Sequence, residues 1–193
     1  MVASLPHFGA GGNFVEYPSR SFLPTVPNRL WLIESGYVRS YIYTEEGSLI
    51  VMGIWGPGEV VGAALYSIHP VYLETITPVQ ARSTAWVTYA NKQHLYAAYL
   101  KQAEALLVIR SQKRVELMVT KLLQWLGQRF GQSLEQGQVL ELRLTHQDIA
   151  EILGVTRVTI TRTFGLLEQQ GFMQRLSTQR IILREADVWH YQI

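Results

Sequence analysis

The sequence of 193 residues contains no cysteine. This absence excludes disulfides, thiolate zinc sites, Cys-ligated iron–sulfur clusters and a cysteine nucleophile. Charged residues are sparse, at 17% against 48% hydrophobic residues, and this balance favours a folded core over disorder. The chain has no apolar run near the roughly 18 residues that a membrane span needs, and its start lacks the pattern of a secretory signal. We therefore expect a folded, cytoplasmic protein with no membrane association.

The net charge of +2 is distributed unevenly along the chain. Residues 1–90 hold 4 Lys or Arg and 6 Asp or Glu, residues 91–131 hold 7 and 2, and residues 132–193 hold 6 and 7. Near the end of the chain, residues 156–184 hold five arginines against Glu168 alone. Such clustering indicates a surface that faces phosphates, and a merely solvated basic face is the alternative on charge alone.

Residues 1–90 have the composition of short strands joined by turns. The first thirty residues are rich in proline and glycine, so we expect them to be irregular. Further on, aromatic and β-branched segments alternate with turn signals every 8–12 residues or so. The pattern predicts an N-terminal antiparallel β-roll in an α+β protein, with strands near 31–33, 37–43, 49–55, 60–61 and 79–89.

Residues 91–131 differ in character, because glycine and proline are absent from 91 to 126. Apolar residues recur there at steps of three and four, as they do along one face of a helix. We predict one long dimerisation helix whose seam packs against a second copy of the chain. A single helix packed in one globular core is the alternative. The expected seam consists of Val108, Val115, Met118, Leu122 and Trp125.

Residues 132–193 carry the signals of two short helices joined by a tight turn. We expect a polar loop at 132–138 and a strand at 139–144 before them, and a hairpin after them. Thr145 can cap the first helix with its side chain, and the side chain of Asp148 can in turn accept the backbone N–H of Thr145. Gly154 suits the turn, and Thr156 can cap a second helix over about 157–170. This spacing predicts a winged helix-turn-helix, for which a generic helix pair is the alternative.

The second of these helices separates a core face from an exposed face. Ile160, Phe164 and Leu167 lie within about a 60° sector at 100° per residue, so they must face the core. The opposite face presents arginines, a threonine and a valine, which suit a recognition helix in a major groove. Helix N-termini and the hairpin supply further groups for phosphates. The expected DNA-binding residues are Arg157, Val158, Thr161, Arg162, Thr156, Thr145, His146, Gln147, Gln179 and Arg180.

The segment 144–162, Leu-Thr-His-Gln-Asp-Ile-Ala-Glu-Ile-Leu-Gly-Val-Thr-Arg-Val-Thr-Ile-Thr-Arg, resembles the helix-turn-helix signature of the CRP/FNR transcription regulators. Segments 31–36 and 56–62 look like that family's β-roll sensor. The segment 156–162 is most similar to the cyanobacterial NtcA-like members. The resemblance implies a homodimer on double-stranded DNA, with half-sites about 10 bp apart. An activator would also contact RNA polymerase, for which no residue identifies a surface.

The resemblance also implies roles for single residues of the second helix. Arg157 corresponds to the reader of a guanine, and Arg162 to a base or phosphate contact. Val158 stands where cyclic-AMP receptor proteins have a glutamate. This departure favours a palindrome with NtcA-like GTA/TAC half-sites over the TGTGA type.

The sensor half departs from the family pattern for cyclic nucleotides. Two alanines follow Gly62 where these sensors carry a glutamate for the ribose, and their Arg-Ser pair is absent. A buried phosphate without a cationic partner is costly, so we predict no cAMP or cGMP binding and no cofactor. The alternative hypothesis is a sensor in which 2-oxoglutarate or an unknown effector controls DNA binding. Its candidate residues are Gly62, Ala63, Ala64, Arg110 and Arg114.

The middle of the chain is short for the family. It has about 18 fewer residues than the resemblance leads us to expect, or roughly 27 Å of helix at 1.5 Å per residue. The dimerisation helix is therefore predicted to be shorter or to merge with the next helix. We expect a β-roll over 1–90, this helix over 91–131 and the DNA-binding domain over 132–193. The five histidines lack metal-ligand spacing, and no catalytic motif is present, so we predict no enzyme.

Overall fold

The computed structural model describes residues 14–134, 137–176 and 180–183. It consists of two compact units, an N-terminal unit of residues 1–104 and a C-terminal unit of residues 105–193. Their boundary lies inside helix α1 (Lys92–Arg110) and differs from the three-part division predicted above. No helix in the described ranges combines the length and the hydrophobicity that crossing a membrane requires.

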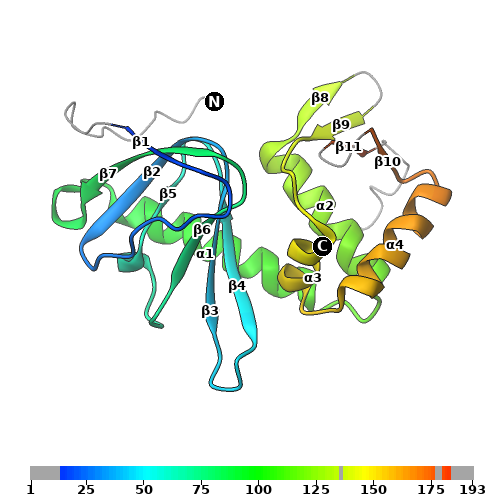
Figure 1. The fold of residues 1–193 in the computed structure, drawn as a ribbon, viewed down its shortest axis with the longest axis horizontal. Helices are drawn as coiled ribbons and strands as arrows, with labels where there is room; N and C mark the ends of the chain where they lie inside the picture. Colours follow the sequence, from blue (N-terminus) through cyan, green and yellow to red (C-terminus); the bar gives the residue numbers. More distant parts are fainter. Residues whose placement is uncertain (1–13, 135–136, 177–179, 184–193) are drawn as a thin grey trace. The chain divides into compact units, whose positions relative to one another are not determined.

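The N-terminal unit contains two antiparallel sheets (Figure 1). The prediction of an antiparallel roll is therefore confirmed. Two short strands that the sequence did not reveal, β1 (Val15–Tyr17) and β6 (Tyr72–Thr75), lie at sheet edges, and residues 86–88 form a 3-10 turn in place of a strand end. One sheet has the order β1 (Val15–Tyr17), β7 (Val79–Ala85), β2 (Arg29–Ser35) and β5 (Val60–Val61), and the other β4 (Leu49–Trp55), β3 (Val38–Tyr43) and β6 (Tyr72–Thr75).

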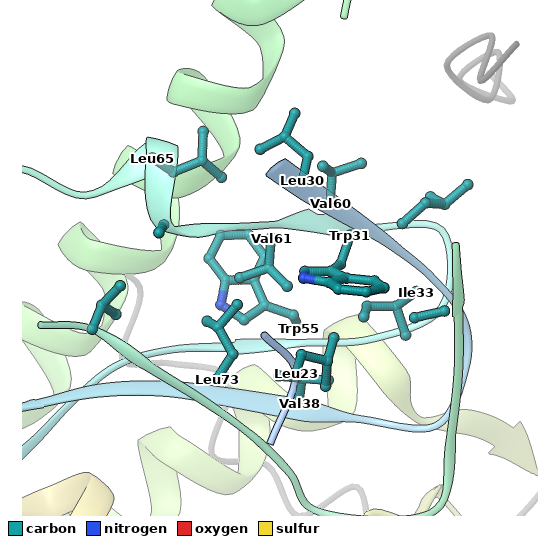
Figure 2. Close-up of a cluster of buried hydrophobic side chains, with 14 of the residues drawn as sticks. Leu23, Leu30, Trp31, Ile33, Val38, Trp55, Val60, Val61, Leu65 and Leu73 are labelled. Atoms are coloured by element: carbon teal, nitrogen blue, oxygen red, sulfur yellow. The ribbon is translucent and has the colours of Figure 1, made fainter. Parts of the chain in front are cut away.

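The core of the N-terminal unit lies between these sheets (Figure 2). Strands of both sheets send apolar side chains into it, and the largest of them that is fully buried is Trp55, which is 1% exposed. Gly36 closes the turn between β2 and β3 with φ at +79°, and a Cβ there would lie 2.1 Å from the Pro78 carbonyl oxygen. Only glycine fits both the left-handed backbone and this close approach.

Two of the polar contacts within the same unit join separate elements. Arg39 on β3 and Glu74 on β6 are register partners and form a buried ion pair, with Nε and Nη2 at 3.0 and 2.8 Å from Glu74 Oε2. Helix α1 is joined to β4, because Gln102 Oε1 accepts the Ile54 backbone N–H at 2.9 Å. A buried polar group without such a partner would destabilise the fold.

The predicted single helix over 91–131 is wrong. Helix α1 ends at Arg110, and helix α2 (Val115–Phe130) begins after a break of four residues. The break is stabilised locally, because Ser111 Oγ and Gln112 Nε2 both donate to the Val108 carbonyl oxygen, at 2.9 and 2.7 Å. These bonds satisfy a carbonyl that a continuing helix would have used. The central helix is therefore short, and it does not merge with the next one.

In the described residues, the C-terminal unit combines the end of α1 and helices α2, α3 (His146–Leu153) and α4 (Arg157–Gln169) with a four-stranded antiparallel sheet (Figure 1). Helices α3 and α4 and the strand pair after them match the predicted winged helix-turn-helix. Within the expected polar loop 132–138, the described residues 132–134 and 137–138 belong to strands. The expected strand 139–144 ends at Leu140, and Arg143 further on has a left-handed backbone with φ of +52°. After α2 come α3 (His146–Leu153) and α4 (Arg157–Gln169), and the sheet has the order β10 (Met173–Arg175), β11 (Ile181–Leu183), β9 (Gly137–Leu140) and β8 (Gln132–Leu134).

Helix α2 belongs to the C-terminal unit, and this changes the predicted dimer seam. Leu122 is fully buried and Met118 is 7% exposed within their own chain, so neither is available to a second copy. Val115 and Trp125 on α2 and Val108 on α1 are half-buried. The amphipathic pattern was read correctly as an apolar face, but its partners are elements of the same unit.

Candidate nucleic-acid interface

Helix α3 begins with the predicted capping box. Thr145 Oγ1 accepts the Asp148 backbone N–H at 3.1 Å, and the Thr145 N–H donates to Asp148 Oδ2 at 2.8 Å. The Thr145 hydroxyl also donates to the same carboxylate oxygen at 2.7 Å. Asp148 is 2% exposed, so its charge is held by these bonds inside the unit.

The turn between the two helices is also as predicted. Gly154 ends α3 with φ and ψ of 70° and 33°, the left-handed conformation that favours glycine. Thr156 then caps α4, because its side chain accepts the Thr159 backbone N–H at 3.2 Å. These local bonds determine where α3 ends and where α4 begins.

Helix α4 is buried on one face and exposed on the other. Ile160, Phe164 and Leu167 are at most 2% exposed. The predicted recognition residues Arg157, Thr161 and Arg162 are exposed, and Val158 is 60% exposed. The structure thus brings two cations, a hydroxyl and an apolar side chain together on the first turns of one helix, which are the groups that read base edges and phosphates.

The predicted phosphate contacts lie at the N-termini of these helices. Thr145, Gln147 and Thr156 are exposed or half-exposed, and His146 lies beside them at the start of α3. Gln147 Nε2 donates to Glu151 Oε1 at 2.8 Å. The first turns of α3 and α4 therefore carry exposed hydroxyl and amide side chains, which are groups that contact phosphates in DNA complexes.

The hairpin after α4 forms as predicted, with Met173 opposite Leu183 and Arg175 opposite Ile181. Arg180 is exposed and forms an ion pair with Glu141, while Gln179 lies outside the described residues. Arg175 Nε donates to Glu168 Oε1 at 2.8 Å, and this bond lowers the pKa of the Glu168 carboxyl.

The sequence prediction missed both of these ion pairs. The signal was present only as opposite charges at distant positions, and such charges do not reveal which pairs form. In the free protein, the pairs with Glu168 and Glu141 hold two of the arginines that the basic cluster contains.

The five candidate effector residues are divided between the two units. Gly62 lies where a Cβ would meet the Arg29 carbonyl oxygen at 2.5 Å, and Ala63 is 4% exposed, whereas Ala64 is half-buried. In the C-terminal unit, Arg110 Nε donates to the Ile152 carbonyl oxygen at 2.7 Å. Arg114 is exposed and pairs with Glu116 at 2.6 Å. Effector binding by these residues stays a prediction.

The chain is similar in sequence to a known domain family and to known regulatory proteins. A family model described as the Crp-like helix-turn-helix domain matches residues 118–187, a range that includes nearly all of α2. The Regulatory protein CysR of Synechococcus elongatus, a CRP/FNR member, is 39% identical over 166 residues, which cover 84% of this chain and 80% of CysR. The Fumarate and nitrate reduction regulatory protein of Escherichia coli K12 is 24% identical over 75% of this chain and 63% of its own length.

Solved structures share the fold. FixK2 from Bradyrhizobium japonicum superposes with a TM-score of 0.78 at 22% identity, covering 93% of this chain and 96% of FixK2. A CRP/FNR-family transcriptional regulator from Thermus thermophilus superposes with a TM-score of 0.67 at 23% identity, covering 90% and 94%. Together with the exposed face of α4, the fold defines a winged helix-turn-helix regulator with an N-terminal β-roll.

The chain belongs to the CRP/FNR family of transcription regulators. The family resemblance predicted from segment 144–162 is therefore confirmed. Members of this family bind DNA and act as dimers. The helix-turn-helix of this chain, α3 and α4, lies in its C-terminal unit.

Proposed function

We propose that this regulator binds a palindromic DNA site with GTA/TAC-like half-sites through the exposed face of α4. Two copies place their α4 helices in successive major grooves, about 10 bp apart. Arg157 reads a guanine, and Val158 contacts a thymine methyl. Phosphate contacts from the N-termini of α3 and α4 supply most of the salt-dependent affinity.

The observation that carries this proposal is the division of α4 into a core face and an exposed face. Arg157, Val158 and Arg162 are exposed while Ile160 and Phe164, on the same helix, are at most 1% exposed. A helix fixed in this way presents its basic side chains with little freedom to rotate about its own axis. Rigid presentation is what base recognition by hydrogen bonding requires.

Replacing Arg157 by alanine is expected to remove sequence preference. The difference in binding free energy between the palindrome and a scrambled duplex should fall by about 1–3 kcal/mol, because a bidentate base contact disappears. Fluorescence anisotropy on both duplexes, at two salt concentrations, measures this difference.

Arg114→Ala provides the matched control for that experiment. It removes the same charge from an exposed position of the same unit, beside Glu116, whose carboxylate accepts a bond from Gln170 at the far end of α4. Arg114→Ala should keep the preference of the wild type. Equal binding of both duplexes by the wild-type protein would show that the proposed half-site is wrong.

We also propose that the second copy packs along α1. Tyr96, Leu100 and Leu107 are 47%, 56% and 70% exposed, and they fall within about a 40° sector at 100° per residue. Ala103 lies in the same stripe, which has the steps of four and three of a coiled-coil seam. The partner on this stripe is a second copy of the chain, because members of the family act as dimers. This seam replaces the one predicted on α2. The half-buried Val108 of the predicted seam lies outside it, about 100° from Leu107.

Leu100→Glu is expected to weaken the dimer at least about tenfold, because each subunit then brings a carboxylate into an apolar seam. Sedimentation velocity over a range of protein concentrations measures the dissociation. Lys101→Glu also introduces an exposed carboxylate on α1 but about 100° away from Leu100, and it should leave the dimer unchanged. Equal behaviour of the two variants would contradict this seam.

Three further parts of the proposal follow from the family. The alternative in which 2-oxoglutarate or another effector controls DNA binding is tested by adding 2-oxoglutarate to the anisotropy experiment. Contact with RNA polymerase is a prediction without an assigned surface. We infer a cytoplasmic location from the DNA-binding function. We also infer that the chain is not an enzyme, because regulation of transcription requires no catalysis by it.

A further inference from the structure

His146 connects the first turn of α3 to the recognition helix. Its Nδ1 lies 2.9 Å from Thr161 Oγ1, and its ring centroid lies 4.8 Å from that of Phe164, with the ring planes tilted by 53°. The half-buried ring therefore lies between the exposed Thr161 and the buried Phe164 of α4. No other histidine in the described ranges lies on α3 or α4.

The hydrogen bonds determine which ring nitrogen titrates. The Thr161 hydroxyl donates its single proton to the Arg157 carbonyl oxygen at 3.0 Å. It therefore accepts from His146, and Nδ1 carries a hydrogen in both protonation states. Titration then takes place at Nε2. In the neutral ring Nε2 is an acceptor, which repels a phosphate oxygen, whereas in the imidazolium it is a charged donor.

Several charged groups face this ring in the free protein. Burial of the ring lowers its pKa, and Arg175 on β10 and Arg157 on α4 lower it further, while Glu168 on α4 acts in the opposite direction. Glu168 is itself hydrogen-bonded to Arg175. On the ring's own helix, the carboxylate of Asp148 is bound by Thr145. The free protein therefore favours the neutral ring at about pH 7.

We propose that His146 binds a DNA backbone phosphate only as the imidazolium, through Nε2–H, so that each subunit takes up a proton when DNA binds. The inference rests on the proposed DNA-binding function. A backbone phosphodiester carries one negative charge, and this charge raises the pKa of the ring in the complex. Affinity for DNA then rises as the pH falls through the interval between the pKa of the complex and that of the free protein. Above and below this interval, affinity does not depend on this group.

The test compares DNA affinity at about pH 8, 7 and 6 and at constant ionic strength, on both the palindrome and the scrambled duplex. Wild-type affinity should rise about five- to fiftyfold from pH 8 to pH 6 on both duplexes, because phosphate contacts carry no sequence information. Calorimetry in two buffers of different ionisation enthalpy should show proton uptake in the same interval.

Three variants separate the charge of His146 from its structural role. His146→Gln keeps a donor for Thr161. Its affinity for DNA should be independent of pH and as weak as that of the wild type at about pH 8. His146→Lys carries a permanent charge and should bind at about pH 8 as tightly as the wild type does at pH 6. His94→Gln removes an exposed histidine of the N-terminal unit and should keep the wild-type pH dependence.

The possible failures are distinguishable from one another. A pH-independent wild type, or a His146→Gln variant with the wild-type pH dependence, would overturn the proton uptake while leaving the DNA-binding function intact. Weak binding by His146→Lys at every pH would overturn it as well. Loss of binding to both duplexes at every pH in the wild type would overturn the DNA-binding function, and the proton uptake with it.

Discussion

Phe164→Ala is expected to lower the free energy of unfolding of the C-terminal unit by about 3–5 kcal/mol, the usual cost of removing a buried aromatic side chain. Phe164 is 1% exposed and is the largest of the α4 side chains that are fully buried. Its removal leaves a cavity beneath the recognition helix and takes away the ring against which His146 packs. The variant should therefore also lose the preference for the palindrome.

Hydrogen exchange resolved by peptide measures this loss for each unit separately. Protection should fall in α3, α4 and the hairpin and stay unchanged in the strands of residues 29–85. Leu166→Ala is the matched control, because Leu166 lies on the same helix but is 41% exposed. This substitution should lower the free energy of unfolding by less than about 1 kcal/mol. Full protection of α4 in Phe164→Ala would show that this helix is not anchored through Phe164.

Glu74→Ala is expected to destabilise the N-terminal unit by about 3–5 kcal/mol, because it leaves Arg39 buried without its carboxylate. Arg39 and Glu74 are 7% and 8% exposed, and both Nε and Nη2 of the arginine donate to the same carboxylate oxygen. Arg20 lies 3.7 Å from the other oxygen at the edge of the pair. Urea unfolding, together with hydrogen exchange in β3 and β6, measures the loss.

A double substitution tests whether the uncompensated charge is the cause. Arg39→Met combined with Glu74→Leu replaces the pair by apolar side chains of similar size, which is often neutral or stabilising. The double variant should recover most of the stability that Glu74→Ala loses. If it is as unstable as the single variant, the side-chain geometry of β3 and β6 matters more than the buried charge.

Much of the helix-turn-helix was predictable because its determinants are local. The capping box joins Thr145 to Asp148, and Thr156 caps α4 through Thr159, so each bond spans three residues. The turn at Gly154 depends on that residue's own backbone conformation. The core face of α4 follows from the helical period alone. None of these features needs a distant partner, and the printed sequence contains them.

The partners of an apolar face were not predictable from the same kind of pattern. Periodicity shows that a helix has an apolar stripe, but it does not show what covers that stripe. Met118 and Leu122 were assigned to a second copy, whereas they are buried in their own unit. The exposed stripe lies on α1, at Tyr96, Leu100 and Leu107.

The sequence by itself determined the family, the helix-turn-helix and the division of α4 into a core face and an exposed face, because bonds and periods spanning a few residues define them. Only the tertiary structure decided the break after Arg110 and the place of α2. It also decided which distant polar groups form hydrogen bonds. Three such bonds join Arg39 to Glu74 (35 residues apart), Arg110 to Ile152 (42 residues apart) and His146 to Thr161 (15 residues apart). Such contacts arise only when packing brings separate elements together, since no local pattern specifies which polar side chains will meet.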